Sequence, residues 1–318
     1  QYGAEIVRDI GAFWTKGLPC DTKAFDYRVI NDEQYVKQAE LLLELGPHTV
    51  GVERDVVTLG QMATLRDKAP ALDWRPVGGL VERYRVVKTE VEVDRIRTAV
   101  DLGDGAMEMA YSVAAPGMTE RELAWNLERF MRENGAEALA FDVIVGAGEN
   151  GSLPHHSPTD RPIRAGEPIV IDLGARVNGY NGDLTRTFAL GEVADPEYAT
   201  VYQLVDQANR VAVASIRPGM SCREIDEVAR AVIRDGGYAE FFGHGLGHGV
   251  GLNVHEAPRL GPATDDEAIQ PGMVVTIEPG IYLPGRFGVR IEDLVVVRPT
   301  GADVLSRARK LPIIVAAR

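Results

Sequence analysis

The sequence is short of cysteine, of positive charge and of long apolar runs. Only two of its 318 residues are cysteines, Cys20 and Cys222, and their contexts suggest neither a metal-binding pair nor a disulfide framework. No apolar run approaches the roughly 20 residues that a membrane-spanning helix needs, and the opening residues do not resemble a signal peptide. We therefore expect a reduced, cytoplasmic protein. Because the chain opens with Gln1 instead of methionine, we also expect that N-terminal residues have been removed or left out.

Positive charge is scarce relative to negative charge. Lys and Arg number 34 against 47 Asp and Glu, which leaves a formal net charge of −13 at pH 7. A nucleic-acid-binding protein needs clustered cations that displace counterions from phosphates, so this balance argues against nucleic acid as a partner. Hydrophobic residues make up 45% and charged residues 25%. These values are ordinary for a soluble globular protein, and at roughly 150 residues per domain the length predicts about two domains.

Residues 1–87 are interpreted as a short α/β domain. Helices are predicted from Asn31 to about Leu45 and over residues 57–67, and strands over residues 49–53 and 72–77. No cluster of reactive side chains occurs in this part of the sequence. We therefore expect the chemistry of the protein to lie in residues 88–318.

Residues 88–318 contain an internal repeat that predicts the architecture. The motif Pro116-Gly-Met-Thr119-x-x-Glu122 recurs 102 residues later as Pro218-Gly-Met-Ser221-x-x-Glu224, and both copies have the form of a helix capping box. A pair of strand-like runs follows each pair of predicted helices. We therefore predict an α+β fold of two similar α-α-β-β halves around one curved antiparallel sheet, preceded by the small N-terminal domain.

The histidines are concentrated in two short segments. Of the six, five are His155, His156, His244, His248 and His255. Glycines at every odd position from 243 to 251 exclude a stable helix around the second segment, because each costs about 1 kcal/mol relative to alanine. In an extended strand the side-chain period is two, so His244 and His248 face the same side. Such glycine spacing has little packing value, which favours a functional role for these histidines over a place in the core.

Four carboxylates lie where a metal site could use them. Asp172 ends an apolar run, and Asp183 follows 11 residues later beyond a turn, so a hairpin brings them near each other. Glu278 and Glu292 are equidistant from Gly285 in a predicted turn, which places them nearly opposite each other. Buried like charges side by side cost stability unless a cation or a shared proton compensates them.

An imidazole completes the predicted metal site. Four carboxylates together with His248 suit two divalent ions that activate water for hydrolysis. The oxygen-rich set favours Mn²⁺ or Co²⁺ over a structural zinc, which prefers Cys and His, although Zn²⁺ remains an alternative.

Further motifs around these residues carry a family resemblance. They are Leu153-Pro-His155, Ile171-Asp-Leu-Gly174, Gly179-Tyr-Asn-Gly-Asp183-Leu-Thr-Arg-Thr187, the glycine-histidine strand, Ile277-Glu-Pro-Gly280 and Gly288-Val-Arg-Ile-Glu-Asp293. From about Lys88 to Val315 the chain resembles the pita-bread metallopeptidase family of prolidase (Xaa-Pro dipeptidase), Xaa-Pro aminopeptidase, methionine aminopeptidase and the non-metal relative creatinase. Residues 1–87 resemble the creatinase-type N-terminal domain but are shorter.

The resemblance implies roles for individual residues. The implied metal ligands are Asp172, Asp183, His248, Glu278 and Glu292, with Asp183 and Glu292 bridging two ions. The implied catalytic residues are His155, His244, His255, Glu278 and Arg290. The histidines would handle the substrate and the tetrahedral intermediate, and Glu278 would also shuttle a proton. Two roles stay open for Arg290, which either screens the carboxylates or binds the C-terminal carboxylate of a dipeptide.

The function implied by the resemblance is hydrolysis of the Xaa-Pro peptide bond at a dinuclear metal site. We favour a dipeptidase of the prolidase kind, with an Xaa-Pro dipeptide or short peptide as its substrate. Xaa-Pro aminopeptidase, methionine aminopeptidase and a non-catalytic binding module on the same fold remain as alternatives, in that order. The resemblance also implies a homodimer.

Overall fold

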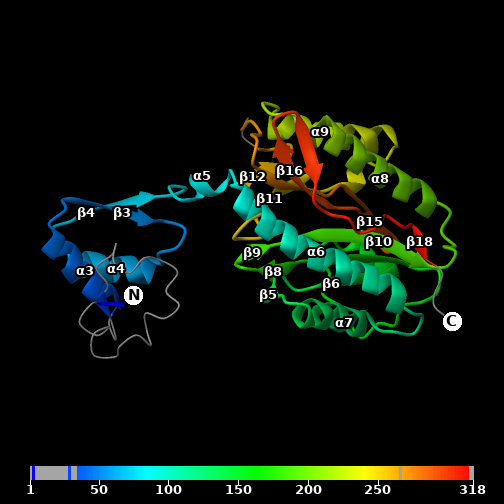
Figure 1. The fold of residues 1–318 in the computed structure, drawn as a ribbon, viewed down its shortest axis with the longest axis horizontal. Helices are drawn as coiled ribbons and strands as arrows, with labels where there is room; N and C mark the ends of the chain where they lie inside the picture. Colours follow the sequence, from blue (N-terminus) through cyan, green and yellow to red (C-terminus); the bar gives the residue numbers. More distant parts are fainter. Residues whose placement is uncertain (1, 4–27, 30–33, 265–266, 315–318) are drawn as a thin grey trace. The chain divides into compact units, whose positions relative to one another are not determined.

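The computed structural model describes residues 2–3, 28–29, 34–264 and 267–314. The chain divides into two compact units, Gln1–Leu80 and Val81–Arg318 (Figure 1). Cys20 and Asn31, the predicted start of a helix, lie outside the described residues, whereas Cys222 is a buried free thiol. Within the described part of the chain, no helix is both long and apolar enough to cross a membrane.

The first unit has an α/β arrangement, as the sequence predicts. Its elements are β1 (Tyr2–Gly3), β2 (Arg28–Val29), α3 (Gln34–Leu45), β3 (Thr49–Glu53), α4 (Leu59–Lys68) and β4 (Asp73–Val77). Strands β3 and β4 pair in parallel, which the intervening helix α4 allows. The core is small and is built around Ala39, Leu65, Ala69 and Leu72.

The second unit repeats a pair of helices followed by strands. Its helices are α5 (Glu82–Arg85), α6 (Glu90–Val113), α7 (Glu120–Glu133), α8 (Tyr198–Ser215) and α9 (Cys222–Asp235), with 3₁₀ turns η1 (Gly148–Ser152) and η2 (Ala239–Phe241). Both predicted capping boxes are present, since Thr119 caps α7 with Glu122 and Ser221 caps α9 with Glu224. The repeat in the sequence is therefore a repeat in the structure.

Each half of the second unit contributes its own strands. The first half has β5 (Ala138–Leu139), β6 (Ile144–Ala147), β7 (Pro168–Leu173), β8 (Ala175–Val177), β9 (Tyr180–Asn181) and β10 (Leu184–Leu190), and β18 (Ile313–Ile314) joins its edge. The second half has β11 (Gly247–Gly249), β12 (Glu256–Leu260), β13 (Val274–Ile277), β14 (Gly280–Leu283), β15 (Phe287–Arg290), β16 (Asp293–Arg298) and β17 (Gly301–Val304). Among the described residues, the larger sheets have the orders β18-β10-β7-β6 and β12-β11-β13-β16-β17, and the smaller ones are β5-β8-β9 and β14-β15.

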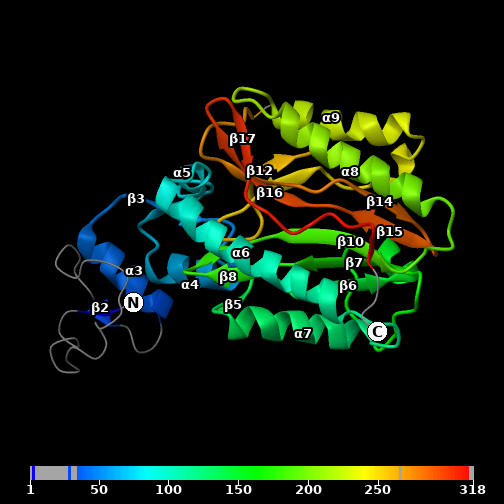
Figure 2. The ribbon, with the colours of Figure 1, turned by 45° about the vertical axis from the view of Figure 1, so that its right-hand side comes forward.

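Helices α7, α8 and α9 cover the strands of their own half, whereas α6 also packs against strands β13 and β16 of the second half. Figure 2 shows α8 and α9 on one side of the strands, with α6 and α7 lying against the strands of the first half. A large apolar core fills the space between α8, α9 and the second set of strands, and a second core lies under α6 and α7. This arrangement confirms the predicted α+β fold of two similar halves.

The strands form separate ladders that meet near the carboxylates, where the sequence predicts one continuous sheet. The backbone N–H of Glu292 donates to the carbonyl of Thr185 on β10 at 3.0 Å, so the two halves are joined there. The N–H of Glu278 donates to the carbonyl of Leu246 instead of to its own hairpin, and Pro279 has no N–H to donate. The ladder is therefore interrupted where Glu278 and Glu292 emerge.

Candidate metal centre and active site

Glu278 and Glu292 lie opposite each other on one β-hairpin, as the sequence predicts. The ladder between β13 and β16 ends with the pair Ile277 and Asp293, and the ladder between β14 and β15 continues in the same register. This register places the two glutamates at the interruption between the ladders. Opposed residues on an antiparallel pair point to the same face, so both carboxylates reach the same side.

Asp172 and Asp183 come from the neighbouring hairpin of β7 and β10. Asp172 pairs with Thr185, and Asp183 stands two residues before Thr185, immediately ahead of β10. Because side chains alternate along a strand, Asp172, Asp183 and Thr185 share a face. The Asp183 side chain is only 5% exposed. Two pairs of carboxylates, one from each half of the unit, therefore face one another.

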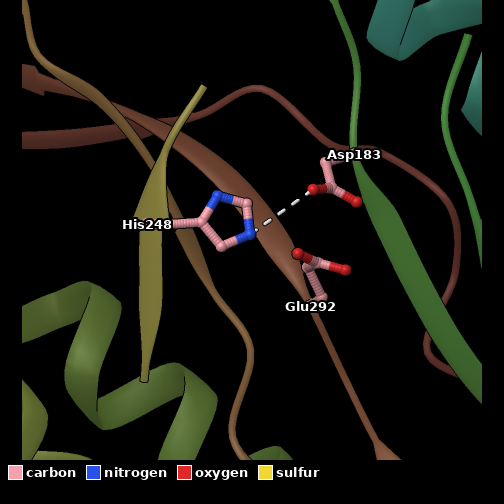
Figure 3. Close-up of side chains that lie close together, drawn as sticks. All are labelled: Asp183, His248 and Glu292. Carbon is pink, nitrogen blue, oxygen red and sulfur yellow. Dashed lines mark ion pairs between the residues drawn. The ribbon is translucent and has the colours of Figure 1, made fainter. Parts of the chain in front are cut away.

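His248 on β11 brings an imidazole into this group. Figure 3 shows His248, Asp183 and Glu292 pointing toward a common centre, and ligand atoms of all three lie within 4.8 Å of one another. The His248 Nε2 atom is 3.7 Å from Asp183 Oδ2 and 3.3 Å from Glu278 Oε1. Nδ1 donates to the carbonyl of Gly249 at 3.2 Å, so in the neutral ring Nε2 keeps its lone pair for a ligand.

Burial and mutual repulsion act on the clustered carboxylates. Burial, and then the charge of Glu292, raises the pKa of Asp183 well above its ordinary value. The pKa of Glu292 is likewise raised well above its ordinary value, by burial and then by Glu278 and Asp172. Burial also raises the pKa of Glu278, but the hydrogen bond with His248 and nearby positive charges outweigh it and lower that pKa. Such repulsion is what a cation between the carboxylates would relieve.

The donor set fits divalent metal ions. Asp172 Oδ1 is buried and accepts no hydrogen bond among the described residues, although its partner oxygen Oδ2 accepts one from Arg290 at 2.7 Å. A buried carboxylate oxygen without a donor is costly unless something else binds it. Carboxylate oxygens with a single imidazole suit two divalent ions, and Asp172, Asp183, His248, Glu278 and Glu292 would hold them.

Arg290 is buried and fully engaged with this cluster. Its guanidinium donates to Asp172 at 2.7 Å, to the hydroxyls of Tyr282 at 2.9 Å and Thr185 at 3.1 Å, and to the carbonyl of Pro154 at 3.3 Å. Only 3% of the residue is exposed. These contacts use the guanidinium to hold protein groups together, which corresponds to the structural alternative left open for this residue.

A hydrogen-bonded chain links Arg290 to His244. Tyr282 accepts a hydrogen bond from Arg290 and lies 3.0 Å from His244 Nε2. His244 Nδ1 donates to the carbonyl of Gly245 at 2.8 Å, so Nε2 accepts from the Tyr282 hydroxyl. Burial lowers the pKa of His244 and raises that of Tyr282 to about 12, so these two side chains are uncharged at pH 7 beside the Arg290 cation. Tyr282 is not among the residues predicted from the sequence, although its place four residues after Glu278 on a strand puts both on one face.

The remaining predicted histidines line a cavity in front of the carboxylates. His155 is exposed in the cavity wall, and the ring of His255 lies 4.4 Å from that of His248, edge to face. Burial, and then the charge of His248, lowers the pKa of His255. The cavity has a volume of about 810 Å³ and contains all five candidate metal ligands. The structure thus brings together every site residue that the sequence predicts.

Arg259 is a second cationic group in this cavity, which the sequence analysis did not single out. It lies on β12 directly opposite His248, so its side chain extends from the same face. Among the described residues its side chain makes no ion pair or hydrogen bond, and the residue is exposed. Arg259 pairs with His248 because the register of the β11–β12 ladder shifts between His248 and Gly249. This shift cannot be predicted from the sequence.

Comparison with known proteins agrees with this geometry. Residues 94–299 match metallopeptidase family M24, and residues 20–87 match the creatinase/prolidase N-terminal domain. The chain belongs to metallopeptidase family M24. As a member of this family it is a metal-dependent enzyme, which sets aside the non-catalytic binding module considered from the sequence.

Among relatives of this M24 metallopeptidase are enzymes named for Xaa-Pro substrates. It is 38% identical to the Xaa-Pro dipeptidase of Pyrococcus furiosus over 82% of this chain and 74% of that protein. The structure of Xaa-Pro dipeptidase from Bacillus anthracis is similar with a TM-score of 0.87 at 37% identity, covering 92% of this chain and 82% of that one. For X-Pro aminopeptidase from Thermotoga maritima the TM-score is 0.83 at 35% identity, covering 91% and 82%.

Proposed function

We propose that this protein is a dinuclear Xaa-Pro dipeptidase that hydrolyses the peptide bond before proline. The observation that carries the proposal is the cavity in which four carboxylates and His248 converge beside Arg259, whose side chain has no partner among the described residues. The similarity to Xaa-Pro dipeptidases supports it. We also propose residues 1–87 and 88–318 as its domains, and the cytoplasm as its location.

Two divalent ions would supply Lewis acidity and a lowered pKa for a bound water, and we propose Mn²⁺ or Co²⁺ because the donors are mostly oxygen. The protein's own groups then move protons and hold the substrate. Glu278 lines the cavity, so its carboxylate can accept a proton from the attacking water and deliver it to the leaving proline nitrogen. His255, neutral at pH 7, is placed to stabilise the developing oxyanion by donating an N–H.

The walls of the cavity suit a proline residue. The nitrogen of an Xaa-Pro bond carries no hydrogen, so the site need not offer an acceptor there. Phe141, Val143, Ile144 and Leu260 supply apolar surface among the lining residues. A free dipeptide also needs a cationic group in the site, because its C-terminal carboxylate lies close to the bond that is cleaved.

We propose that Arg259 meets this demand by binding the C-terminal carboxylate. Arg290 is less suited to it, because its donors are committed to Asp172, Tyr282, Thr185 and Pro154. Loss of a charged hydrogen bond worth roughly 1.5–3 kcal/mol would lower kcat/KM about 10- to 150-fold. We expect Arg259→Met to do this for Xaa-Pro dipeptides while leaving their C-terminal amides nearly unaffected.

Arg290→Lys is the matched comparison for this experiment. Because Arg290 supports Asp172, we expect dipeptides and amides to suffer alike in this variant and bound metal to decrease. Equal losses on both substrates in Arg259→Met would contradict the carboxylate role. Wild-type preference for Xaa-Pro-Xaa tripeptides over dipeptides would instead favour the Xaa-Pro aminopeptidase alternative.

Two further parts of the proposal have simple tests. Metal analysis of the purified protein, followed by removal and re-addition of Mn²⁺, Co²⁺ or Zn²⁺, identifies the ions that restore hydrolysis. The proposed homodimer predicts a mass of twice 34.6 kDa by light scattering at micromolar concentration. The monomer mass would contradict it.

A further inference from the structure

Glu120, the first residue of α7, has a carboxylate that is completely buried. Burying an ionised carboxylate is unfavourable unless hydrogen bonds replace its lost water. One oxygen, Oε1, accepts from the backbone N–H of Ala147 at 2.9 Å and from the Asn150 side chain at 3.0 Å. Both donors lie far along the chain from Glu120, at the last residue of β6 and in the 3₁₀ turn η1 that follows it. The carboxylate therefore serves groups outside its own helix.

The other oxygen, Oε2, binds the far end of the same segment. It accepts from His156 Nε2 at 2.9 Å, and from the hydroxyl of Thr159 at 2.7 Å and its backbone N–H at 3.1 Å. All of these donors belong to residues 147–159, which we call the His155 loop. A single carboxylate thus ties together the start, the middle and the end of this loop.

His155 lies between two anchored neighbours in this loop. Before it, the carbonyl of Pro154 accepts a hydrogen bond from Arg290 at 3.3 Å, and Arg290 in turn holds Asp172. After it, the ring of His156 is held by Glu120. The backbone on both sides of His155 is therefore fixed, while His155 itself is exposed in the cavity.

An ordinary helix-end role does not account for this arrangement. A carboxylate in the first turn of a helix interacts favourably with the helix dipole, and Glu122 already serves α7 in this way through its capping box with Thr119. Glu122 is exposed, and within the part of the chain that the structure describes its hydrogen bonds are with Thr119 and not with the His155 loop. Glu120, two residues away, instead uses both of its oxygens on that loop.

We propose that Glu120 is a positioning residue, which orders the His155 loop so that His155 faces the substrate in the proposed Xaa-Pro dipeptidase reaction. Displacement of a catalytic group by about 1 Å can cost on the order of 100-fold in rate. The proposal rests on the proposed function for the role of His155. It assigns no contact between Glu120 and substrate or metal.

The central experiment is a double-mutant cycle of Glu120→Gln with His155→Ala. We expect Glu120→Gln alone to lower kcat about 10- to 100-fold with little change in KM or in bound metal. In the His155→Ala background the same substitution should have no further effect, because the group that it positions is gone. An equal loss in both backgrounds would mean that Glu120 acts through general stability, and would overturn the proposal.

Glu122→Gln is the matched control on the same turn of α7. It removes a carboxylate of the same size whose hydrogen bonds with described residues all lie within the capping box, so we expect kcat to stay unchanged. Hydrogen exchange provides a readout without turnover: amides of residues 147–159 should exchange faster in Glu120→Gln, and those of α6 should not. If Glu120→Gln does not fold, His156→Phe removes one donor of the network and enters the same cycle.

The outcomes separate this proposal from the proposed function. If His155→Ala hydrolyses Xaa-Pro dipeptides at the wild-type rate, the positioning role is overturned and the dipeptidase proposal stands. If the wild-type protein loaded with Mn²⁺ or Co²⁺ hydrolyses no Xaa-Pro peptide, the dipeptidase proposal fails. In that case hydrogen exchange still tests the positioning role of Glu120. Unchanged amide exchange of the His155 loop in Glu120→Gln overturns that role by itself.

Discussion

The two halves of the second unit hold their candidate active-site histidines by different means. In the first half, Glu120 on α7 accepts hydrogen bonds from the His155 loop. In the second half, Asp226 on α9 binds Arg230 through both oxygens, at 2.8 and 2.9 Å, and also accepts from the N–H of Leu246 at 3.0 Å. Arg230 then donates to the carbonyl of His244 at 2.8 Å.

The two halves use different polar side chains because their histidine segments present different hydrogen-bonding groups to the neighbouring helix. The His155 loop presents N–H and O–H donors, which a carboxylate alone can satisfy. The segment before β11 presents carbonyls of Phe242 and His244 as well as one N–H, so it needs a donor and an acceptor together. An ion pair supplies both. The two halves thus share their helix caps and hairpins. They differ in the polar groups that hold each histidine segment, which match the donors and acceptors of that segment.

The largest expected effect tests whether the halves contribute equally to metal binding. Asp183 comes from the first half and Glu292 from the second, and both face the same centre (Figure 3). We expect Asp183→Ala and Glu292→Ala each to abolish detectable hydrolysis. Bound metal should decrease by more than the roughly 10- to 100-fold that loss of an outer-shell partner costs. Full activity with two metals retained in either variant would remove that residue from the site.

A smaller effect, on stability, distinguishes the buried ion pair of Asp226 and Arg230 in the second half from ion pairs on the surface. Asp226→Asn leaves the partly buried Arg230 without its partner, and removing one member of a buried pair costs about 3–5 kcal/mol. Because 18% of the Arg230 side chain is exposed, we expect about 3 kcal/mol in the free energy of unfolding. Urea denaturation measures it, and Glu227→Gln, in an exposed pair on the same helix, is the control. A loss below about 1 kcal/mol would place Asp226 with ordinary surface pairs.

The capping boxes predict equal effects in the two halves. Thr119→Ala and Ser221→Ala each remove the side chain that accepts from the third residue of its helix. Each substitution should lower the free energy of unfolding by about 1 kcal/mol. If the two values measured by urea denaturation differ clearly, then the caps are not equivalent despite their common motif.

The smallest expected effect is the acid dependence of the Glu120 network. Burial raises the pKa of Glu120, but its hydrogen bonds from Ala147, His156, Asn150 and Thr159 outweigh it and lower the pKa below the ordinary value of 4.5. A lowered pKa contributes stability that is present above pH 4.5 and is lost as the pH falls through the folded-state pKa. The stability difference between wild type and Glu120→Gln should therefore hold above about pH 4.5 and shrink below it. If the stability difference instead grows as the pH falls below 4.5, the prediction that the network lowers the pKa of Glu120 is contradicted.

Local patterns in the sequence predict much of this molecule. The caps at Thr119 and Ser221 depend on residues three apart, and the opposition of Glu278 and Glu292 depends on one turn at Gly285, so both can be read from the sequence. The contacts of Glu120 cannot, because they join it to donors 27 to 39 residues away.

Longer-range pairings escape sequence reasoning for the same reason. Arg290 meets Asp172 across 118 positions, and nothing near either residue indicates the other. The exposure of Arg259 beside His248 depends on strand register across an irregular ladder. Residue identities therefore indicate which chemistry is available. Only the fold shows that Arg290 binds protein groups, while Arg259 is left exposed in the cavity.

The link between Thr185 and Glu292 has a consequence for folding. The backbone N–H of Glu292 donates to the carbonyl of Thr185, and the Thr185 hydroxyl donates to the Glu292 carboxylate at 2.6 Å. These bonds cross between the halves, so the ligand cluster forms once both halves have docked. The free energy of metal binding would then add to the folding stability of the whole unit. A separated half, even with its helices and hairpins intact, would hold part of the ligand set and bind metal weakly.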